Sequence, residues 1–186
     1  AIDQKTLYFI SDMPGGFGGT DIYSSVFDGI SWSKPENIGK EINTPGNEMF
    51  PFIADDGTFY FSSDAHNNLG GLDVFVTSYD SKNKKWLRVE NLNYPLNSSK
   101  DDFAFVLKSD NKTGYISSNR NEVDNIYAVQ KNDPTFYLSG KVTIKGKGVP
   151  FEGVTIIIFD ETNDILTAKT SLFTDKKGEY KTKLRP

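Results

Sequence analysis

Two glycine-rich loops place pairs of aspartates where they could hold a cation. One loop runs from Asp12 to Asp21 and contains four glycines, and its counterpart runs from Asp64 to Asp73. Carboxylates and freed backbone carbonyls are the oxygen ligands that Ca²⁺ takes in proteins. The same residue types also build strand connections, in which glycines supply positive φ angles and aspartates accept backbone N–H bonds. The spacing does not fit an EF-hand, and a third copy has Asn119 at the aspartate position, so we expect structural turns with no metal and no cofactor.

The other residues that could do chemistry are one histidine and two pairs of carboxylates. His66 cannot join a His/Cys metal cluster, because the chain has no second His and no Cys. A Ser-His-Asp triad needs a nucleophile elbow, and the sequence has none, so we expect a solvated loop histidine. Asp55-Asp56 and Asp101-Asp102 could supply the two carboxylates of a glycosidase. The first pair lies in a hairpin turn and the second flanks the start of a strand, so we expect no catalytic residue.

Composition narrows the class of protein. The 186 residues carry 25 Asp and Glu against 21 Lys and Arg, and this acidic balance argues against a nucleic-acid binder. Hydrophobic residues make up 37% of the chain, which is enough for a packed core. The longest strongly apolar stretch, 154–159, is far shorter than the roughly 18–20 residues of a membrane-spanning segment. The basic stretches 82–85 and 145–147 are short and are expected on a solvated surface.

The loops must be positioned by β-strands. The apolar residues are mostly aromatic and β-branched and form short runs, such as 6–10, 58–61 and 155–159, which are closed by Gly, Asn, Asp and Ser. No window of a dozen residues has convincing helical spacing of its apolar positions. We therefore predict an all-β protein.

A unit of about fifty residues recurs along most of the chain. The pattern "LYFISD…GGTDIY" is matched 52 residues later by "FYFSSD…GGLDVF", and a third copy reads "GYISSN…DNIY". Phe50–Ile53 matches Phe103–Val106 at an offset of 53. In the complete middle copy, strands are expected near 50–54, 58–63, 73–79 and 85–92. The structural repeat positions are Gly18, Gly19 and Asp21, then Gly70, Gly71 and Asp73, then Asp124, together with Trp32 and Trp86, for which we expect a packing role.

Four short strands per unit are typical of a β-propeller blade. The repeats resemble the WD40-like repeat of TolB-type propellers. The intervening segments "WSKPENIGKEIN" and "WLRVENLNYPLN" resemble the propellers of Bacteroidetes OmpA-family proteins. This resemblance covers residues 1–131 and implies a partial propeller of about two and a half four-stranded blades.

A second domain is expected after a polar linker at 132–135. Its pattern runs through "SGKV", "GVPFEGV" and "TDKKGEY". Residues 136–186 resemble the carboxypeptidase-regulatory-like domain, a transthyretin-related β-sandwich, and the resemblance implies a structural or adhesive module. The chain starts within a blade and stops within the sandwich, so we expect both domains to be incomplete and the chain to be an internal piece of a longer polypeptide.

The pairing of these two domains resembles OmpA-family proteins of the PorE type. That resemblance implies a non-enzymatic scaffold in the periplasm, associated with the outer membrane, that links the type IX secretion or gliding machinery to the cell wall. It further implies a lipoprotein with a PorP/SprF-like outer-membrane protein as partner, and contact with peptidoglycan only through a domain outside this chain. The alternative is a carbohydrate-binding or hydrolytic propeller, which requires polar residues from several blades to converge in a central funnel.

Overall fold

The computed structural model describes residues 3–132, 136–162 and 165–184, and all regular structure in these ranges is β-strand. The predicted all-β class is therefore confirmed. The chain divides into two compact units, Ala1–Lys131 and Asn132–Pro186, which are described separately below. Of the predicted linker, 133–135 lies outside the described residues.

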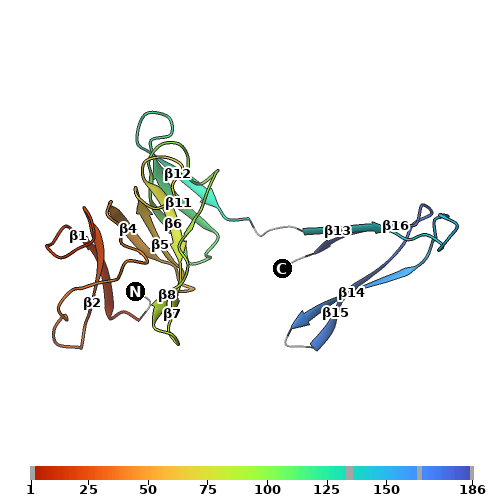
Figure 1. The fold of residues 1–186 in the computed structure, drawn as a ribbon, viewed down its shortest axis with the longest axis horizontal. Coiled ribbons are helices and arrows are strands. Elements are labelled where there is room, and N and C mark those ends of the chain that lie inside the picture. The colour runs from red at the N-terminus through yellow and green to blue at the C-terminus, as the bar shows by residue number, and fades with distance from the viewer. Residues whose placement is uncertain (1–2, 133–135, 163–164, 185–186) are drawn as a thin grey trace. The chain divides into compact units, whose positions relative to one another are not determined.

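The first unit contains three antiparallel sheets of three or four strands and one two-stranded hairpin (Figure 1). The first sheet has the order β1 (Thr6–Ser11), β2 (Asp21–Val26), β3 (Glu36–Asn37). The second has the order β4 (Glu48–Ile53), β5 (Phe59–Ser63), β6 (Asp73–Thr77), β9 (Glu90–Asn91). The third has the order β10 (Asp102–Leu107), β11 (Thr113–Ser118), β12 (Asn125–Gln130). A small hairpin of β7 (Tyr79–Asp80) and β8 (Lys85–Trp86) connects β6 to β9.

The fourth strand of the repeat is shorter than the sequence predicts. In the second sheet, β6 ends at Thr77, and only Glu90 and Asn91 return to pair with it. The expected strands 73–79 and 85–92 are therefore interrupted, because 79–86 folds into its own hairpin. In the third sheet, no described strand pairs with the outer edge of β12.

Strand register corrects the sequence alignment of the third copy by one residue. Asp21 pairs with Ser11, and Asp73 pairs with Ser63. The corresponding Ser118 pairs with Asn125, so Asn125 rather than Asp124 occupies the aspartate position. The shorter loop before β12 hides this shift in the sequence.

A second one-residue correction applies to the first strand of each unit. Both β4 and β10 contain a bulge, with a positive φ of 53° at Phe50 and 52° at Ala104. Register therefore matches β4 to β10 at an offset of 54, not 53, and aligns Glu48 with Asp102. A slip of one residue exchanges the two faces of a strand, so the correction changes which side chains are equivalent.

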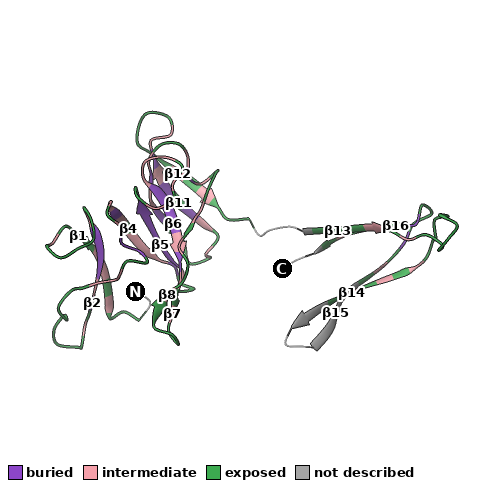
Figure 2. Cartoon of the chain, viewed as in Figure 1, coloured by how far each residue is buried: buried purple, intermediate pink, exposed green. Residues whose placement is uncertain are grey.

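Apolar side chains pack at both junctions between neighbouring sheets. The first junction is built around Ile22, Ile42, Phe59, Phe61 and Phe75, and the second around Ala54, Tyr60, Val74, Phe105 and Ile116. Figure 2 shows β5 and β6 largely buried, whereas β12 is half-buried or exposed. The second sheet is thus covered on both faces.

The second unit consists of two strand pairs. β13 (Phe136–Lys141) pairs with β16 (Glu179–Leu184), and β14 (Thr155–Thr162) pairs with β15 (Ile165–Phe173). In the turn before β16, the Asp175 carboxylate accepts N–H bonds from Lys177 and Glu179. Thr174 is buried and its hydroxyl donates to the Phe151 carbonyl at 2.6 Å, which ties the turn to the segment before β14.

Candidate functional site

The repeated aspartates Asp21 and Asp73 are buried and hold their own loops. The Asp21 carboxylate accepts the Phe17 N–H at 2.5 Å, and Asp73 accepts the Leu69 N–H in the same way. Both side chains are almost fully buried, and one oxygen of each has no hydrogen-bond partner. The carboxylates therefore stabilise the turns, as the turn interpretation predicts.

Each of these aspartates is hydrogen-bonded to an asparagine, which is in turn hydrogen-bonded to a second asparagine. Asn91 donates to Asp73 at 2.7 Å, and Asn97 donates to the Oδ1 of Asn91 at 2.7 Å. The Asn97 amide then accepts the Val74 N–H and donates to the Val74 carbonyl, both at 2.9 Å. The first junction repeats every bond with Asp21, Asn37, Asn43 and Ile22. Each chain of amides satisfies backbone groups of one sheet with a side chain from the segment that leads into the next sheet.

The glycine pairs Gly18-Gly19 and Gly70-Gly71 recur in the repeat for a different physical reason from the one expected. Of the loop glycines that were expected to supply positive φ angles, Gly15 does so with a φ of 94°, whereas for Gly18, Gly19, Gly70 and Gly71 the prediction is wrong. A Cβ on Gly70 would collide with the backbone of Lys100, and the other three would collide with the segment before β4 or β10. Gly18 and Gly70 therefore allow two backbone segments to approach closely, whereas Gly19 and Gly71 leave room for the side chains of Asn47 and Asp101.

Replacing Gly70 by alanine is expected to destabilise the first unit by about 1–3 kcal/mol, because the added methyl meets backbone that cannot rotate away. Hydrogen exchange should speed up at the Asp102 N–H, which bonds to the Leu72 carbonyl across the second junction. The Glu48 N–H, bonded to Thr20 across the first junction, should keep its protection. Gly18→Ala is the matched variant and should reverse this pattern; equal loss at both junctions would contradict the local origin.

An asparagine and an aspartate exchange places between the two junctions. In the first, Asn47 donates its backbone N–H and its side-chain amide to Asp64, both at 2.7 Å. In the second, the Asp101 N–H and carboxylate bind Asn119 at 2.8 and 2.9 Å. The predicted cation residue Asp64 is thus engaged in a junction, while Asp12 is exposed. The four aspartates do not converge, and the described residues contain no group of three His, Cys, Asp or Glu side chains placed to hold a metal ion.

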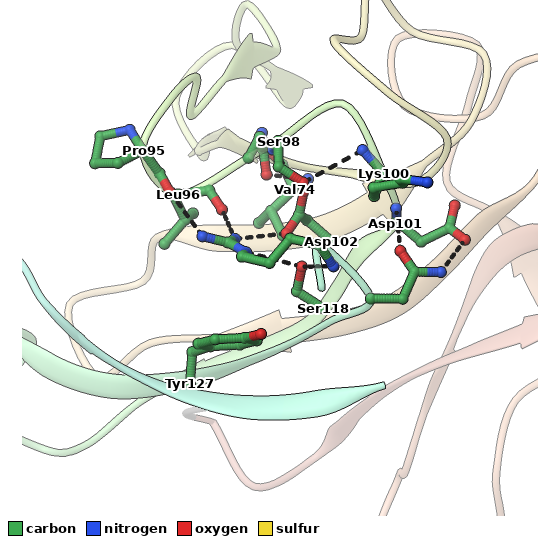
Figure 3. Close-up of polar contacts among 12 residues, drawn as sticks. Val74, Pro95, Leu96, Ser98, Lys100, Asp101, Asp102, Ser118 and Tyr127 are labelled. Atoms are coloured by element: carbon green, nitrogen blue, oxygen red, sulfur yellow. Dashed lines mark hydrogen bonds and ion pairs between the residues drawn. The ribbon is translucent and has the colours of Figure 1, made fainter. Parts of the chain in front are cut away.

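His66 is a junction residue, so the expectation of a solvated histidine is wrong. Its ring is half-buried against Phe75, with centroids 5.0 Å apart, and its Nε2 lies 2.7 Å from the Ile42 carbonyl oxygen. In the second junction, the corresponding contacts to a backbone carbonyl and an aromatic ring are made by Arg120. It donates to the Leu96 carbonyl at 2.5 Å and its guanidinium lies 5.0 Å from the centre of the Tyr127 ring (Figure 3).

Arg120 also closes a buried polar cluster that sequence reasoning missed. It contacts the Asp102 carboxylate at 2.6 Å, and the Asp102 side chain is fully buried. The other Asp102 oxygen accepts the backbone N–H and hydroxyl of Ser98 at 2.5 and 2.7 Å (Figure 3). Glu48 occupies the same place in the first junction and accepts from Thr44 and Ser63. The equal spacing of Thr44-Glu48 and Ser98-Asp102 was the available sequence signal.

The two tryptophans differ although their repeat positions are equivalent. Trp86 packs in the first junction against Phe59, Tyr8 and Tyr79, with ring centroids 4.9, 6.3 and 5.2 Å away. Trp32 contacts only the ring of Phe27 among the aromatic contacts of the described residues, and it is 52% exposed. The expected packing role therefore fits Trp86, whereas Trp32 only forms a bridge with Phe27, directly after β2.

The second junction contains a cavity of about 570 Å³. Its walls come from β5, β6, β10, β11 and β12 and are mainly apolar, with Arg120 and Lys131 among the polar residues. The apolar lining includes Tyr60, Val76, Ile116, Tyr127, Ala128 and Val129. This cavity could take an apolar side chain or ligand.

The structure does not bring together the remaining residues that the sequence offered as candidates for catalysis or binding. Asp55 and Asp56 are exposed in the β4–β5 turn, where Asp56 accepts the Thr58 N–H at 2.9 Å, and Asp101 and Asp102 serve the second junction. The basic stretches 82–85 and 145–147 are exposed, as expected. In the parts of the chain that the structure describes, there is no helix long and apolar enough to cross a membrane.

Exposed aspartates stabilise several turns, and Asp110 is one of the two whose pKa is lowered most, the other being Asp3. Hydrogen bonds from the Thr113 hydroxyl, the Thr113 N–H and the Lys112 N–H lower the pKa of Asp110 from 3.8 to about 2. Because the folded-state pKa is depressed, this turn contributes stability above pH 4 that is lost as the pH falls towards 2.

Thr113→Val is expected to raise the pKa of Asp110 towards 3.8, because it removes the donor that lowers this pKa most. Carboxyl chemical shifts measured by NMR between pH 1.5 and about 6 would follow the change. Lys108→Gln is the control, since Lys108 lowers the same pKa least, and it should leave the titration nearly unchanged. An unchanged midpoint in Thr113→Val would show that the hydroxyl is not the dominant cause.

Comparison with known proteins leaves the family open. No protein-family model matches the chain, and no curated protein matches it.

Proposed function

We propose that residues 1–131 are part of a WD40-like, TolB-type β-propeller and that residues 136–186 are part of a carboxypeptidase-regulatory-like β-sandwich. In this proposal the three sheets are successive blades. Its support is the repetition of whole bonding networks: the same asparagine chain, the same glycine contacts and the same carboxylate cap occur at both junctions. Repeating contacts of this kind are expected when neighbouring units are stacked by a constant rotation.

The chain acts, in this proposal, as a non-enzymatic protein-interaction scaffold. One observation carries it: the residues best suited to chemistry are engaged in structural bonds at the sheet junctions. Asp21, Asp73 and Asp102 hold loop N–H groups, and His66 binds a backbone carbonyl. A catalytic group needs access to a substrate, whereas these side chains are buried or half-buried in separate junctions.

The proposed setting is the periplasm, associated with the outer membrane. The resemblance of the repeats to OmpA-family proteins of the PorE type supports a link between type IX secretion or gliding machinery and the cell wall. A lipoprotein with a PorP/SprF-like outer-membrane partner follows from the same resemblance. Peptidoglycan contact would require a domain outside this chain.

Co-purification with a PorP/SprF-like protein tests this role. The purified chain is immobilised and incubated with detergent-solubilised outer membranes of the source bacterium, and the retained proteins are identified by mass spectrometry. We expect the PorP/SprF-like protein to be retained by the folded chain and not by the heat-unfolded chain. Its absence from the retained fraction, or hydrolysis of a glycan panel by the purified chain, would contradict the proposal.

A further inference from the structure

The β7–β8 hairpin differs from its counterpart in the first sheet by an insertion that contains lysines. Phe27 bridges to Trp32 across a loop of four residues, whereas Tyr79 pairs with Trp86 across a loop of six. The shorter loop has no lysine, and the longer one contains Lys82, Lys84 and Lys85. Since the first sheet makes the same connection without them, the fold requires neither the insertion nor its charges.

The hairpin is a basic feature of an acidic chain. Residues 79–90 carry four basic and two acidic side chains, a net charge of +2, whereas the equivalent residues 27–36 carry one basic and two acidic side chains. The acid within the hairpin, Asp80, accepts the Lys82 N–H at 3.0 Å and the Asn83 side-chain amide at 2.6 Å, so it caps the turn. Four exposed basic residues form no ion pair with any described residue: Lys82, Lys84, Lys85 and Arg88.

Apolar side chains anchor the hairpin and flank its charges. The Trp86 ring lies 4.9 Å from Phe59 and 5.2 Å from Tyr79, which fixes the base of the hairpin in the first junction. The next residue, Leu87, is 46% exposed, and the alternation of side chains places it with Lys85 on the face opposite Trp86. Tyr79 is also half exposed. Basic and apolar side chains therefore reach solvent together.

The position of the hairpin leaves it uncovered by further blades. Figure 1 shows β7 and β8 at the lower end of the first unit. Both sheets of the first junction, into which Trp86 packs, are present in the structure. A further blade of a propeller would pack against the first or the third sheet, so the lysines of the hairpin remain available to a ligand.

We propose that the β7–β8 hairpin docks on the anionic headgroup surface of a membrane, with its lysines beside lipid phosphates and Leu87 in the interface. Lys and Arg side chains near an anionic leaflet add to the attraction one by one. Exposed Leu87 and Tyr79 among these charges favour a membrane over a soluble polyanion, because a membrane also offers an apolar layer. The inference rests on the proposed outer-membrane setting and names the surface that contacts lipid.

Co-sedimentation of the purified full chain with lipid vesicles tests this inference. Vesicles of equal parts phosphatidylglycerol and phosphatidylcholine should bind the chain, and vesicles of phosphatidylcholine alone should not. Binding should weaken about tenfold or more at about 1 M salt, where the screening length falls to about 3 Å. No binding to the phosphatidylglycerol vesicles, or equal binding to both kinds, would overturn the inference. The vesicles contain no protein, so this failure is distinguishable from failure of the co-purification.

Two double variants with the same loss of charge localise the contact. Lys82→Gln/Lys85→Gln should weaken vesicle binding about tenfold or more, because it removes two of the charges that face the lipid. Lys145→Gln/Lys147→Gln, in the other basic stretch, is the matched control and should bind like the unchanged chain. Circular dichroism and thermal melting establish that the variants fold. Equal binding by the two double variants would overturn the inference.

Leu87→Gln separates a membrane from a soluble polyanion. It leaves the charge of the hairpin unchanged and removes an apolar side chain that would enter the interface, so vesicle binding should weaken about threefold or more. Unchanged binding by the folded Leu87→Gln protein would mean that charge alone is recognised and would overturn the membrane assignment.

Discussion

Asp102→Ala is expected to destabilise the first unit by about 3–5 kcal/mol, because it removes one partner of a buried ion pair and leaves the other uncompensated. The Asp102 side chain is fully buried and makes a 2.6 Å contact with Arg120, whose side chain is only 25% exposed. The same carboxylate satisfies the Ser98 N–H and hydroxyl. The loss therefore combines an unpaired guanidinium with two unsatisfied donors.

Chemical denaturation followed by tryptophan fluorescence measures this loss, because both tryptophans lie in the first unit. Glu122→Ala is the control: it breaks the exposed Lys100–Glu122 pair and should change the free energy of unfolding by about 0.5 kcal/mol or less. A similarly small effect of Asp102→Ala would show that water replaces the lost bonds and that the cluster does not hold the junction.

The sequence was sufficient to predict the all-β class, most of the longer strands and the repeat, because these depend on local residue types. Aromatic and β-branched runs closed by turn residues specify strands wherever they occur. The repeated Ile42-Asn43 and Leu96-Asn97 marked the residues that brace each junction, although their bonds to Ile22 and Val74 became visible only in three dimensions. The repeat therefore located the important positions before their roles were known.

The roles that sequence reasoning missed belong to pairs of residues that change together. Asn47–Asp64 becomes Asp101–Asn119, so each position compared alone is a mismatch while the bonded pair is retained. His66 and Arg120 differ in type and stand one residue apart in the repeat, yet both reach the equivalent carbonyl. A single-residue comparison cannot detect such exchanges, because the hydrogen bond depends on both partners.

The cavity and the different burial of the tryptophans depend on neighbours rather than on the residues themselves. Trp86 has Tyr8 of the preceding sheet to pack against, whereas the first sheet has no described sheet before it to cover Trp32. Both residues are followed four and five residues later by a Glu-Asn pair, so their repeat positions are equivalent. The burial of each tryptophan therefore depends on which sheet lies beside it, and the residues around it in the sequence do not show this.

Phe59→Ala is expected to destabilise the first unit by about 3–5 kcal/mol, the usual range for removing a fully buried aromatic ring. The Phe59 ring is inaccessible to solvent and lies 5.2 Å from Tyr8, 4.9 Å from Trp86 and 6.1 Å from Phe61, measured between centroids. Its loss leaves a hollow at the centre of the first junction that the rigid strands on either side cannot close. Phe173→Ala in the second unit is the matched control, since that side chain is 68% exposed, and it should change stability by about 0.5 kcal/mol or less.

A double-mutant cycle separates the packing of Phe59 and Trp86 from general damage to the core. Because the two rings touch, the combined loss should fall short of the sum of the single losses by about 0.5–1.5 kcal/mol. In a Trp32→Phe background, the emission of Trp86 reports the junction alone, and Phe59→Ala should shift it to longer wavelength as water reaches the indole. Strict additivity with an unshifted emission would mean that the two rings do not form one packed unit.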